Sequence, residues 1–178
     1  LARRRLIFEE LFLLACALGR MKGRHSKADG YKMQSCDLNA FWSALPFAPT
    51  NAQRRAVSDA LSDMQSGKAM NRLVQGDVGS GKTLVAAALI WYAAKNGYMS
   101  AFMAPTEILA KQHFDTLLGI LSPLGLRIGL LTGAMTAKQK REVKTSLKNG
   151  EFDLIIGTHA LISENVVYHR LGLSITDE

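Results

Sequence analysis

The chain has 178 residues, of which 48% are hydrophobic and 21% charged, a balance typical of one globular domain with a short extension. Its net charge is +7, from 22 Lys and Arg against 15 Asp and Glu, so an acidic partner such as nucleic acid is favoured over a basic one. The two cysteines, Cys16 and Cys36, have neither metal-ligand spacing nor a disulfide framework, which excludes a disulfide-rich secreted fold and indicates a reducing, cytoplasmic location.

The chain begins with a basic run and an apolar stretch that imitate a signal peptide. Glu9 and Glu10 interrupt the apolar stretch, and no clear small-residue cleavage site follows. Apolar residues recur at helical spacing from Ile7 to Leu18, which predicts an amphipathic helix too short and too charged to cross a bilayer. We therefore expect no membrane partner. Because the first residue is Leu1 and not Met, we interpret the chain as part of a longer protein.

Residues 19–39 are rich in Gly, Ser, Asp, Lys and Arg without periodicity, and we predict a linker or mobile loop there. This divides the chain into a helix and linker from a preceding domain, 1–40, and a nucleotide-binding domain, 41–178. A helix is predicted from Thr50 to about Gln65, because Thr50 and Gln53 form a capping box. Its predicted inward-facing residues are Ala52, Ala56, Val57, Ala60, Leu61 and Met64.

The most specific local pattern fits G-x-x-x-x-G-K-[ST], the phosphate-binding P-loop. Its residues are Gly76, Asp77, Val78, Gly79, Ser80, Gly81, Lys82 and Thr83. The glycines allow consecutive backbone N–H groups to point at one phosphate, Lys82 supplies a positive charge, and Thr83 offers a hydroxyl to Mg²⁺. Asn71–Gln75 before the loop is predicted to be a buried strand, and Leu84–Lys95 after it a helix. The expected cofactors are ATP and Mg; a glycine-rich turn without a ligand is the alternative.

Downstream of the P-loop, apolar strands alternate with helices. The predicted strands are Met99–Ala104, Leu126–Leu131, Phe152–Ile156 and Leu173–Thr176, and the predicted helices are Glu107–Leu121 and Thr136–Asn149. Strands separated by helices form parallel sheets that are covered on both faces. The predicted fold class is therefore α/β, a P-loop NTPase with a parallel sheet, preceded by a helix and linker.

Two carboxylates, Asp177 and Glu178, follow the last predicted strand. A P-loop enzyme needs one carboxylate to hold the metal and usually another to orient the attacking water. We predict that Asp177 holds Mg²⁺ with Thr83 and that Glu178 activates the water, which makes them catalytic residues together with Lys82. The alternative is two solvated surface acids at a strand end.

Read together, five segments closely resemble the RecG-type DNA helicases of bacteria, which are superfamily 2 motors. The segments are Met70–Thr83, Ala104–Ala110, Gln112–His113, Ile156–Leu161 and Asp177–Glu178. The resemblance implies a RecA-like domain that couples ATP hydrolysis to movement on duplex DNA, with remodelling of stalled forks and Holliday junctions in DNA repair and recombination. A transcription-repair coupling translocase is similar but usually has Phe where this chain has Ser80.

The resemblance also assigns roles to individual residues. Phe47 and Gln53 match an element associated with adenine recognition. The residues that match backbone-contacting DNA motifs are Pro105, Thr106 and Glu107 in motif Ia, and Gly157, Thr158 and His159 in motif Ib. Capping and turn formation are the alternatives for Thr106 and Thr158, and the capping box alone accounts for Gln53. The expected partner is branched duplex DNA, bound through its backbone by a monomer.

Other interpretations stay open at this point. A nucleotide kinase or AAA-type ATPase also carries a P-loop, and an inactive truncated product is a third possibility. The chain stops at Glu178, before the family's second RecA-like domain, so we expect the isolated chain to bind nucleotide weakly and not to unwind DNA. A basic stripe of Lys138, Arg141, Lys144 and Lys148 fits either a solvated helix face or a phosphate-binding surface.

Overall fold

The computed structural model describes residues 5, 8–16, 19 and 30–177. Residues 8–16 are helical, in agreement with the amphipathic pattern, while Ile7, Leu18 and Glu178 lie outside the described residues. No helix in these described ranges is long and apolar enough to cross a membrane.

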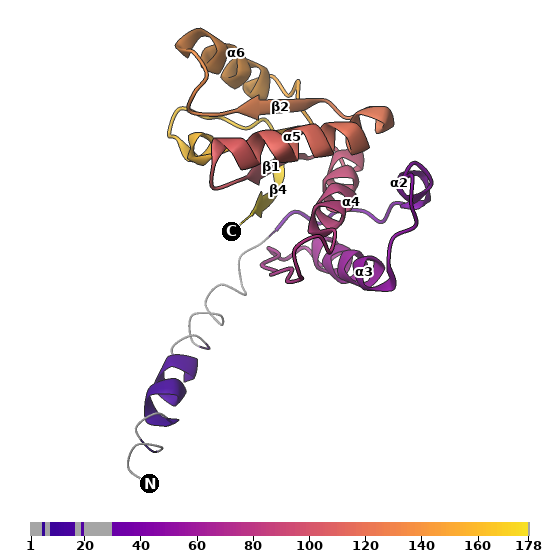
Figure 1. Cartoon of the computed structure of the whole chain (residues 1–178), viewed down its shortest axis with the longest axis vertical. Helices are drawn as coiled ribbons and strands as arrows, with labels where there is room; N and C mark the ends of the chain where they lie inside the picture. The colour runs from indigo at the N-terminus through magenta and orange to yellow at the C-terminus, as the bar shows by residue number, and fades with distance from the viewer. Residues whose placement is uncertain (1–4, 6–7, 17–18, 20–29, 178) are drawn as a thin grey trace.

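Four parallel strands form the centre of the domain, in the spatial order β2-β3-β1-β4 (Figure 1). Their bounds are β1 (Met99–Met103), β2 (Ile128–Leu131), β3 (Leu154–Gly157) and β4 (Leu171–Thr176). The helices of this part of the chain are α4 (Lys82–Lys95), α5 (Glu107–Leu121) and α6 (Ala137–Lys148), with short 3₁₀ turns η1 (Ser122–Leu124) and η2 (His159–Ile162). The alternation of parallel strands and helices confirms the predicted α/β fold.

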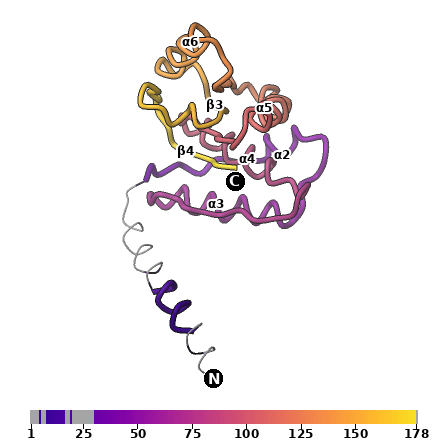
Figure 2. The backbone as a smooth tube through the Cα atoms, turned by 60° about the vertical axis from the view of Figure 1, so that its left-hand side comes forward, coloured from indigo at the N-terminus to yellow at the C-terminus, as the bar shows by residue number. Residues whose placement is uncertain are grey.

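Helices cover both faces of this sheet, because successive side chains of a strand point to opposite faces. Phe102 and Ile156 belong to the larger core, which also contains the buried residues of α4 and α5. Ala101 and Ile155 belong to a smaller core with Leu147 of α6. Figure 2 shows α6 and α3 at opposite ends of the domain, with the strands between them.

Helix α4 is the most buried helix of the domain. Its residues from Leu84 to Ala93 are all buried, which explains why it is rich in Ala and Leu without a polar stripe. Helix α3 (Asn51–Gln65) packs against it through a stripe that includes Val57, Ala60 and Met64. Ala52 was predicted to face inward, but it is exposed, because the first turn of α3 extends beyond this packed stripe.

The packed domain extends upstream of residue 41. Met33, in the stretch predicted as linker, is 3% exposed and its N–H donates to the carbonyl of Met64. The Tyr92 hydroxyl donates to the carbonyl of Gln34 at 2.8 Å. Helix α2 (Asn39–Ser43) then buries Phe41 completely. Residues 30–38 are therefore irregular in conformation but packed onto α3 and α4.

The predicted strand Asn71–Gln75 is wrong. This segment has no strand conformation, and the Leu73 side chain is 86% exposed. In the described sheet, β4 pairs with β1 and the P-loop segment pairs with neither. A short apolar run forms a strand only where a neighbouring strand satisfies its backbone N–H and C=O groups. Among the described residues no such neighbour lies beside Asn71–Gln75.

Candidate nucleotide and DNA site

The carboxyl ends of the four parallel strands bring four segments of the chain to one edge of the sheet. Thr106 lies just beyond β1, Thr132 follows β2, Thr158 follows β3 and Asp177 follows β4. Helix α4 is joined to the start of β1 by a short turn and packs against β1 and β4, so it runs back along the sheet in the opposite direction to β1. The N-terminus of α4 therefore lies at the same edge as the carboxyl ends of the strands. Ligands of open α/β sheets bind at this edge, which makes it the candidate site.

The P-loop has the backbone conformation that its glycines predict. Gly79 and Gly81 both have φ near +79°, in the left-handed region where residues with a Cβ are strained. Gly81 is the N-cap of α4, and a Cβ there would overlap the Nε2 atom of Gln53. The left-handed conformation is the reason that position 81 favours glycine, since the Gln53 amide is the end of a flexible side chain and could move.

Lys82 is the first residue of α4 and folds back over the P-loop. Its Nζ atom donates to the carbonyls of Gly76 at 2.7 Å and Asp77 at 3.0 Å. Among the described residues no side chain caps the start of α4, so its free N–H groups and positive dipole end point at the loop. Such a helix start binds a phosphate group readily.

Gln53 connects α3 to the P-loop. Its Oε1 atom accepts from the Thr50 N–H at 2.9 Å, and its Nε2 atom donates to the Ser80 carbonyl at 2.9 Å. The first bond belongs to the predicted capping box, which the structure confirms. The second bond holds the loop in place, a role that the sequence did not suggest. Phe47 is 55% exposed, and the predicted adenine contact of Phe47 and Gln53 stays a prediction.

Asp177 is held by β1 and by α5. Its N–H donates to the Met103 carbonyl at 2.9 Å, which continues the β1–β4 pairing by one residue. Its Oδ2 atom lies 2.7 Å from Nε2 of His113, a side chain that is only 16% exposed. The imidazole ring packs against Phe102 with ring centroids 4.7 Å apart. A carboxylate only accepts hydrogen bonds, so the proton of this contact belongs to Nε2 of His113.

His113 is a site residue that the sequence did not predict. The signal was its position on the buried face of α5, between Ala110 and Leu117, which are both completely buried. A polar side chain on such a face needs a hydrogen-bond partner, and here the partner is Asp177. Because 64 residues separate His113 from Asp177, no local sequence pattern could reveal this contact.

Thr83 and Asp177 suit a metal that arrives with a nucleotide. In the part of the chain that the structure describes, no group of three or more His, Cys, Asp or Glu side chains could hold a metal ion. Mg²⁺ commonly takes one or two protein ligands and completes its shell with water and phosphate oxygens. One hydroxyl and one carboxylate meet that need, because His113 uses Oδ2 of Asp177 and leaves Oδ1 available. The role of Glu178 stays a prediction, since Glu178 lies outside the described residues.

The predicted motif Ia residues surround the start of α5. Thr106 is exposed and caps the helix, with its Oγ1 atom accepting from the Leu109 N–H at 3.3 Å. Glu107 points to the turn before α6, where its Oε1 atom accepts from the Ala134 N–H at 2.7 Å. Pro105 is exposed beside them. The capping alternative for Thr106 is therefore present in the structure, and DNA contact by this motif stays a prediction.

The predicted motif Ib residues form the turn after β3. A Cβ at Gly157 would overlap the backbone of Leu131, so the two strands approach as closely as glycine allows. Thr158 is 9% exposed, and its carbonyl accepts from the Leu161 N–H as η2 begins. His159 is exposed at the surface of the same turn. Their DNA contacts also stay a prediction, and the burial of Thr158 favours contact through the turn's backbone and His159.

Comparison with known proteins supports this arrangement. Residues 50–178 match the model of the family described as DEAD/DEAH box helicase. The chain is 46% identical to the ATP-dependent DNA helicase RecG of Streptococcus pneumoniae serotype 4, over 99% of this chain and 26% of that protein. It is 45% identical to the ATP-dependent DNA helicase RecG of Thermotoga maritima, over 99% of this chain and 23% of that protein.

A solved structure agrees with the sequence matches. The structure described as RecG bound to a three-way DNA junction superimposes with a TM-score of 0.90 at 45% identity, covering 99% of this chain and 25% of that chain. The chain thus spans about a quarter of the length of the curated relatives it matches. These matches cover the P-loop, α5, the turn after β3 and β4 together.

Proposed function

The chain belongs to the DEAD/DEAH box helicase family, and on that basis we propose that it is the first ATP-binding motor domain of a RecG-like DNA helicase. The whole protein would couple ATP hydrolysis to branch migration and to the remodelling of forks and Holliday junctions. The other P-loop proteins considered above are not favoured, because the relatives matched at 45–46% identity are RecG helicases.

One observation carries the proposal. The P-loop at the start of α4 and the carboxylate after β4 come to the same edge of one parallel sheet. The left-handed Gly81 and the free N-terminus of α4 suit a phosphate, and Asp177 suits the metal that accompanies it. Magnesium, when bound with the nucleotide, supplies positive charge that stabilises the developing charge on the transferred phosphoryl group.

The proposed roles follow from the contacts of each side chain. Lys82 would exchange the loop carbonyls that it now contacts for phosphate oxygens, which are stronger acceptors because they are charged. Thr83 and Asp177 would hold the metal, and Glu178 would orient the attacking water. His113 keeps the Asp177 carboxylate in one orientation and is a positioning residue. DNA would pass over the start of α5 and the turn after β3.

A titration of ADP into the 178-residue chain, with and without Mg²⁺, tests the nucleotide site by calorimetry. We expect measurable binding that Lys82→Ala abolishes, since the variant loses the only side-chain cation that bonds the described P-loop. Lys95→Ala is the matched control, because Lys95 lies at the other end of the same helix. Equal ADP affinity in the parent and the Lys82→Ala variant would reject the nucleotide site.

A further inference from the structure

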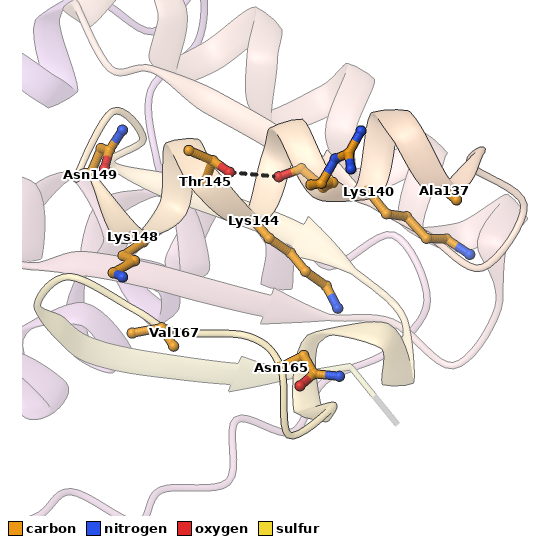
Figure 3. A pocket seen from close by; sticks show the side chains of 9 residues that line it. Ala137, Lys140, Lys144, Thr145, Lys148, Asn149, Asn165 and Val167 are labelled. Atoms are coloured by element: carbon orange, nitrogen blue, oxygen red, sulfur yellow. Dashed lines mark hydrogen bonds between the residues drawn. The ribbon is translucent and has the colours of Figure 1, made fainter.

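A basic groove lies on the face of the domain that α6 covers. It is an open depression of about 650 Å³ between α6 and the segment after η2. Figure 3 shows the side chains of Lys144 and Lys148 extending from α6 toward Asn165 and Val167 of that segment. The Lys140 side chain extends toward the start of α6, where its Nζ atom donates to the Gly133 carbonyl. The groove's cations are Lys140, Arg141, Lys144 and Lys148.

Helical geometry places these cations together. Positions 140, 141, 144 and 148 follow helical spacing and share one side of α6, next to the apolar stripe that buries Leu147. The basic stripe predicted from the sequence includes Lys138 and lacks Lys140. In the structure Lys140 lines the groove, whereas Lys138 is exposed elsewhere on the helix.

The groove carries positive charge that protein carboxylates do not neutralise. In the described part of the chain, the ion pairs involve Arg5, Arg72, His113 and Arg127, and none involves a groove cation. Among the groove lining there is no acidic side chain, and the other polar groups are hydroxyl and amide groups of Thr145, Asn149 and Asn165. Charges left uncompensated in a concave surface attract an anion.

Local hydrogen bonds hold the segment opposite α6 in place. The Ser163 Oγ atom donates to the carbonyl of Ala160 at 3.0 Å, and the Tyr168 hydroxyl donates to the carbonyl of Leu161 at 2.9 Å. The Nζ atom of Lys144 lies 3.5 Å from the Ser163 Oγ atom across the groove. These bonds anchor both ends of the segment opposite α6, which limits the conformational entropy lost on binding.

We propose that this groove binds the sugar-phosphate backbone of duplex DNA, outside the two motifs discussed above. Lys, Arg, Thr and Asn are the side chains that contact phosphates without reading bases. A protein partner is disfavoured, because stable protein interfaces have an apolar or aromatic centre and this groove offers only Val167 and Ala137 as apolar lining.

The dimensions suit several phosphates of one strand. From Lys140 to Lys148 the helix rises about 12 Å at 1.5 Å per residue, and one DNA strand carries a phosphate about every 3.4 Å of helix axis. The groove could therefore contact about three phosphates.

The groove adjoins η2, which begins with the predicted DNA residue His159, so a duplex held at that turn could continue along α6. The inference rests on the proposed function only in taking DNA as the partner.

Fluorescence anisotropy of a labelled duplex across a salt series tests the groove, with folding of each variant checked by circular dichroism. The groove variant is Arg141→Ala, Lys144→Ala and Lys148→Ala combined. The matched control, Lys32→Ala, Lys68→Ala and Lys138→Ala combined, removes the same charge from exposed positions outside the groove. We expect the groove variant to lower the slope of log affinity against log salt by about two to three, at about 0.9 for each lost phosphate contact. The control should stay close to the parent.

The outcomes of this experiment distinguish a failure of the groove proposal from a failure of the proposed function. If the parent binds the duplex and both triple variants keep the parent's affinity and salt slope, the groove proposal is wrong while the DNA partner stands. If the parent shows no salt-dependent DNA binding, both are wrong. A polyglutamate competitor that displaces the duplex at equal charge concentration would identify a general polyanion surface and would also overturn the assignment to a phosphate backbone.

Discussion

Nε2 of His113 lies 2.7 Å from Oδ2 of Asp177, so helix α5 bonds directly to the carboxylate that follows β4. The same helix begins at Thr106, in the predicted DNA motif Ia. Thr106 and His113 are separated by seven residues, about two helical turns. A shift of α5 on DNA binding would therefore reach the proposed metal carboxylate through one rigid element and one hydrogen bond.

The first prediction concerns this hydrogen bond. His113→Phe keeps a ring against Phe102 but removes the donor to Asp177. Groups that orient a metal-binding carboxylate typically contribute about 10- to 100-fold to metal affinity. We expect the increase in ADP affinity that Mg²⁺ causes to shrink by such a factor, while ADP binding without Mg²⁺ stays unchanged. Calorimetry with and without Mg²⁺ measures both.

His113→Gln is the matched control, because its amide nitrogen can still donate a hydrogen bond. We expect it to recover part of the Mg²⁺ effect that His113→Phe loses. A purely structural role would lower ADP affinity equally in both metal conditions, and that result would argue against positioning of Asp177.

A second prediction separates two roles for Gln53. Its amide bonds the Ser80 carbonyl of the P-loop, so Gln53→Ala should weaken ADP and GDP binding by the same factor. An adenine contact would instead make the loss specific to ADP, since the two nucleotides share the diphosphate and differ in the base. Thr50→Ala is the control: it costs about 1 kcal/mol of helix capping but leaves the bond to Ser80 intact. Competition binding with both nucleotides distinguishes the outcomes.

A third prediction uses two glycines with opposite surroundings. Gly81→Ala should destabilise the domain by about 1–2 kcal/mol, because alanine is strained at positive φ. Gly119→Ala lies inside α5 with open space around its Cβ position, and it should stabilise by about 0.5–1 kcal/mol. Urea unfolding followed by circular dichroism compares the two. Similar stability of both variants would contradict the left-handed conformation assigned to Gly81.

The features that the sequence predicted well are those decided by neighbouring residues. Helix α5 has the predicted bounds Glu107–Leu121, and the capping boxes at Thr50 and Thr136 are both formed. A cap depends on side chains three residues apart, so the chain carries that information locally. The P-loop is similar, because its conformation follows from glycine spacing.

The features that the sequence predicted poorly depend on distant partners. Asn71–Gln75 has the composition of a strand but no pairing neighbour in the described sheet. Strand β2 begins at Ile128 and not at Leu126, because pairing with Leu154 of β3 sets its start. The bond between His113 and Asp177 joins residues that only the assembled sheet brings together. Sequence patterns therefore predict individual helices and strands, whereas strand pairing and side-chain contacts across the sheet depend on the whole folded domain.

The last prediction concerns Glu107, which the family resemblance places in a DNA-contacting motif. Its carboxylate accepts from the Ala134 N–H at 2.7 Å and so fixes the turn that leads into α6. Glu107→Gln keeps an acceptor for that bond and removes a negative charge that repels phosphates, so duplex affinity should stay equal or rise. Glu107→Ala loses the bond, at a cost of about 1 kcal/mol, and a loosened turn should lower duplex affinity. Thermal unfolding and anisotropy on one duplex measure both effects. Equal loss of DNA binding in the two variants, with no change in melting temperature, would show that the carboxylate itself takes part in DNA contact and that anchoring the turn is not its main role.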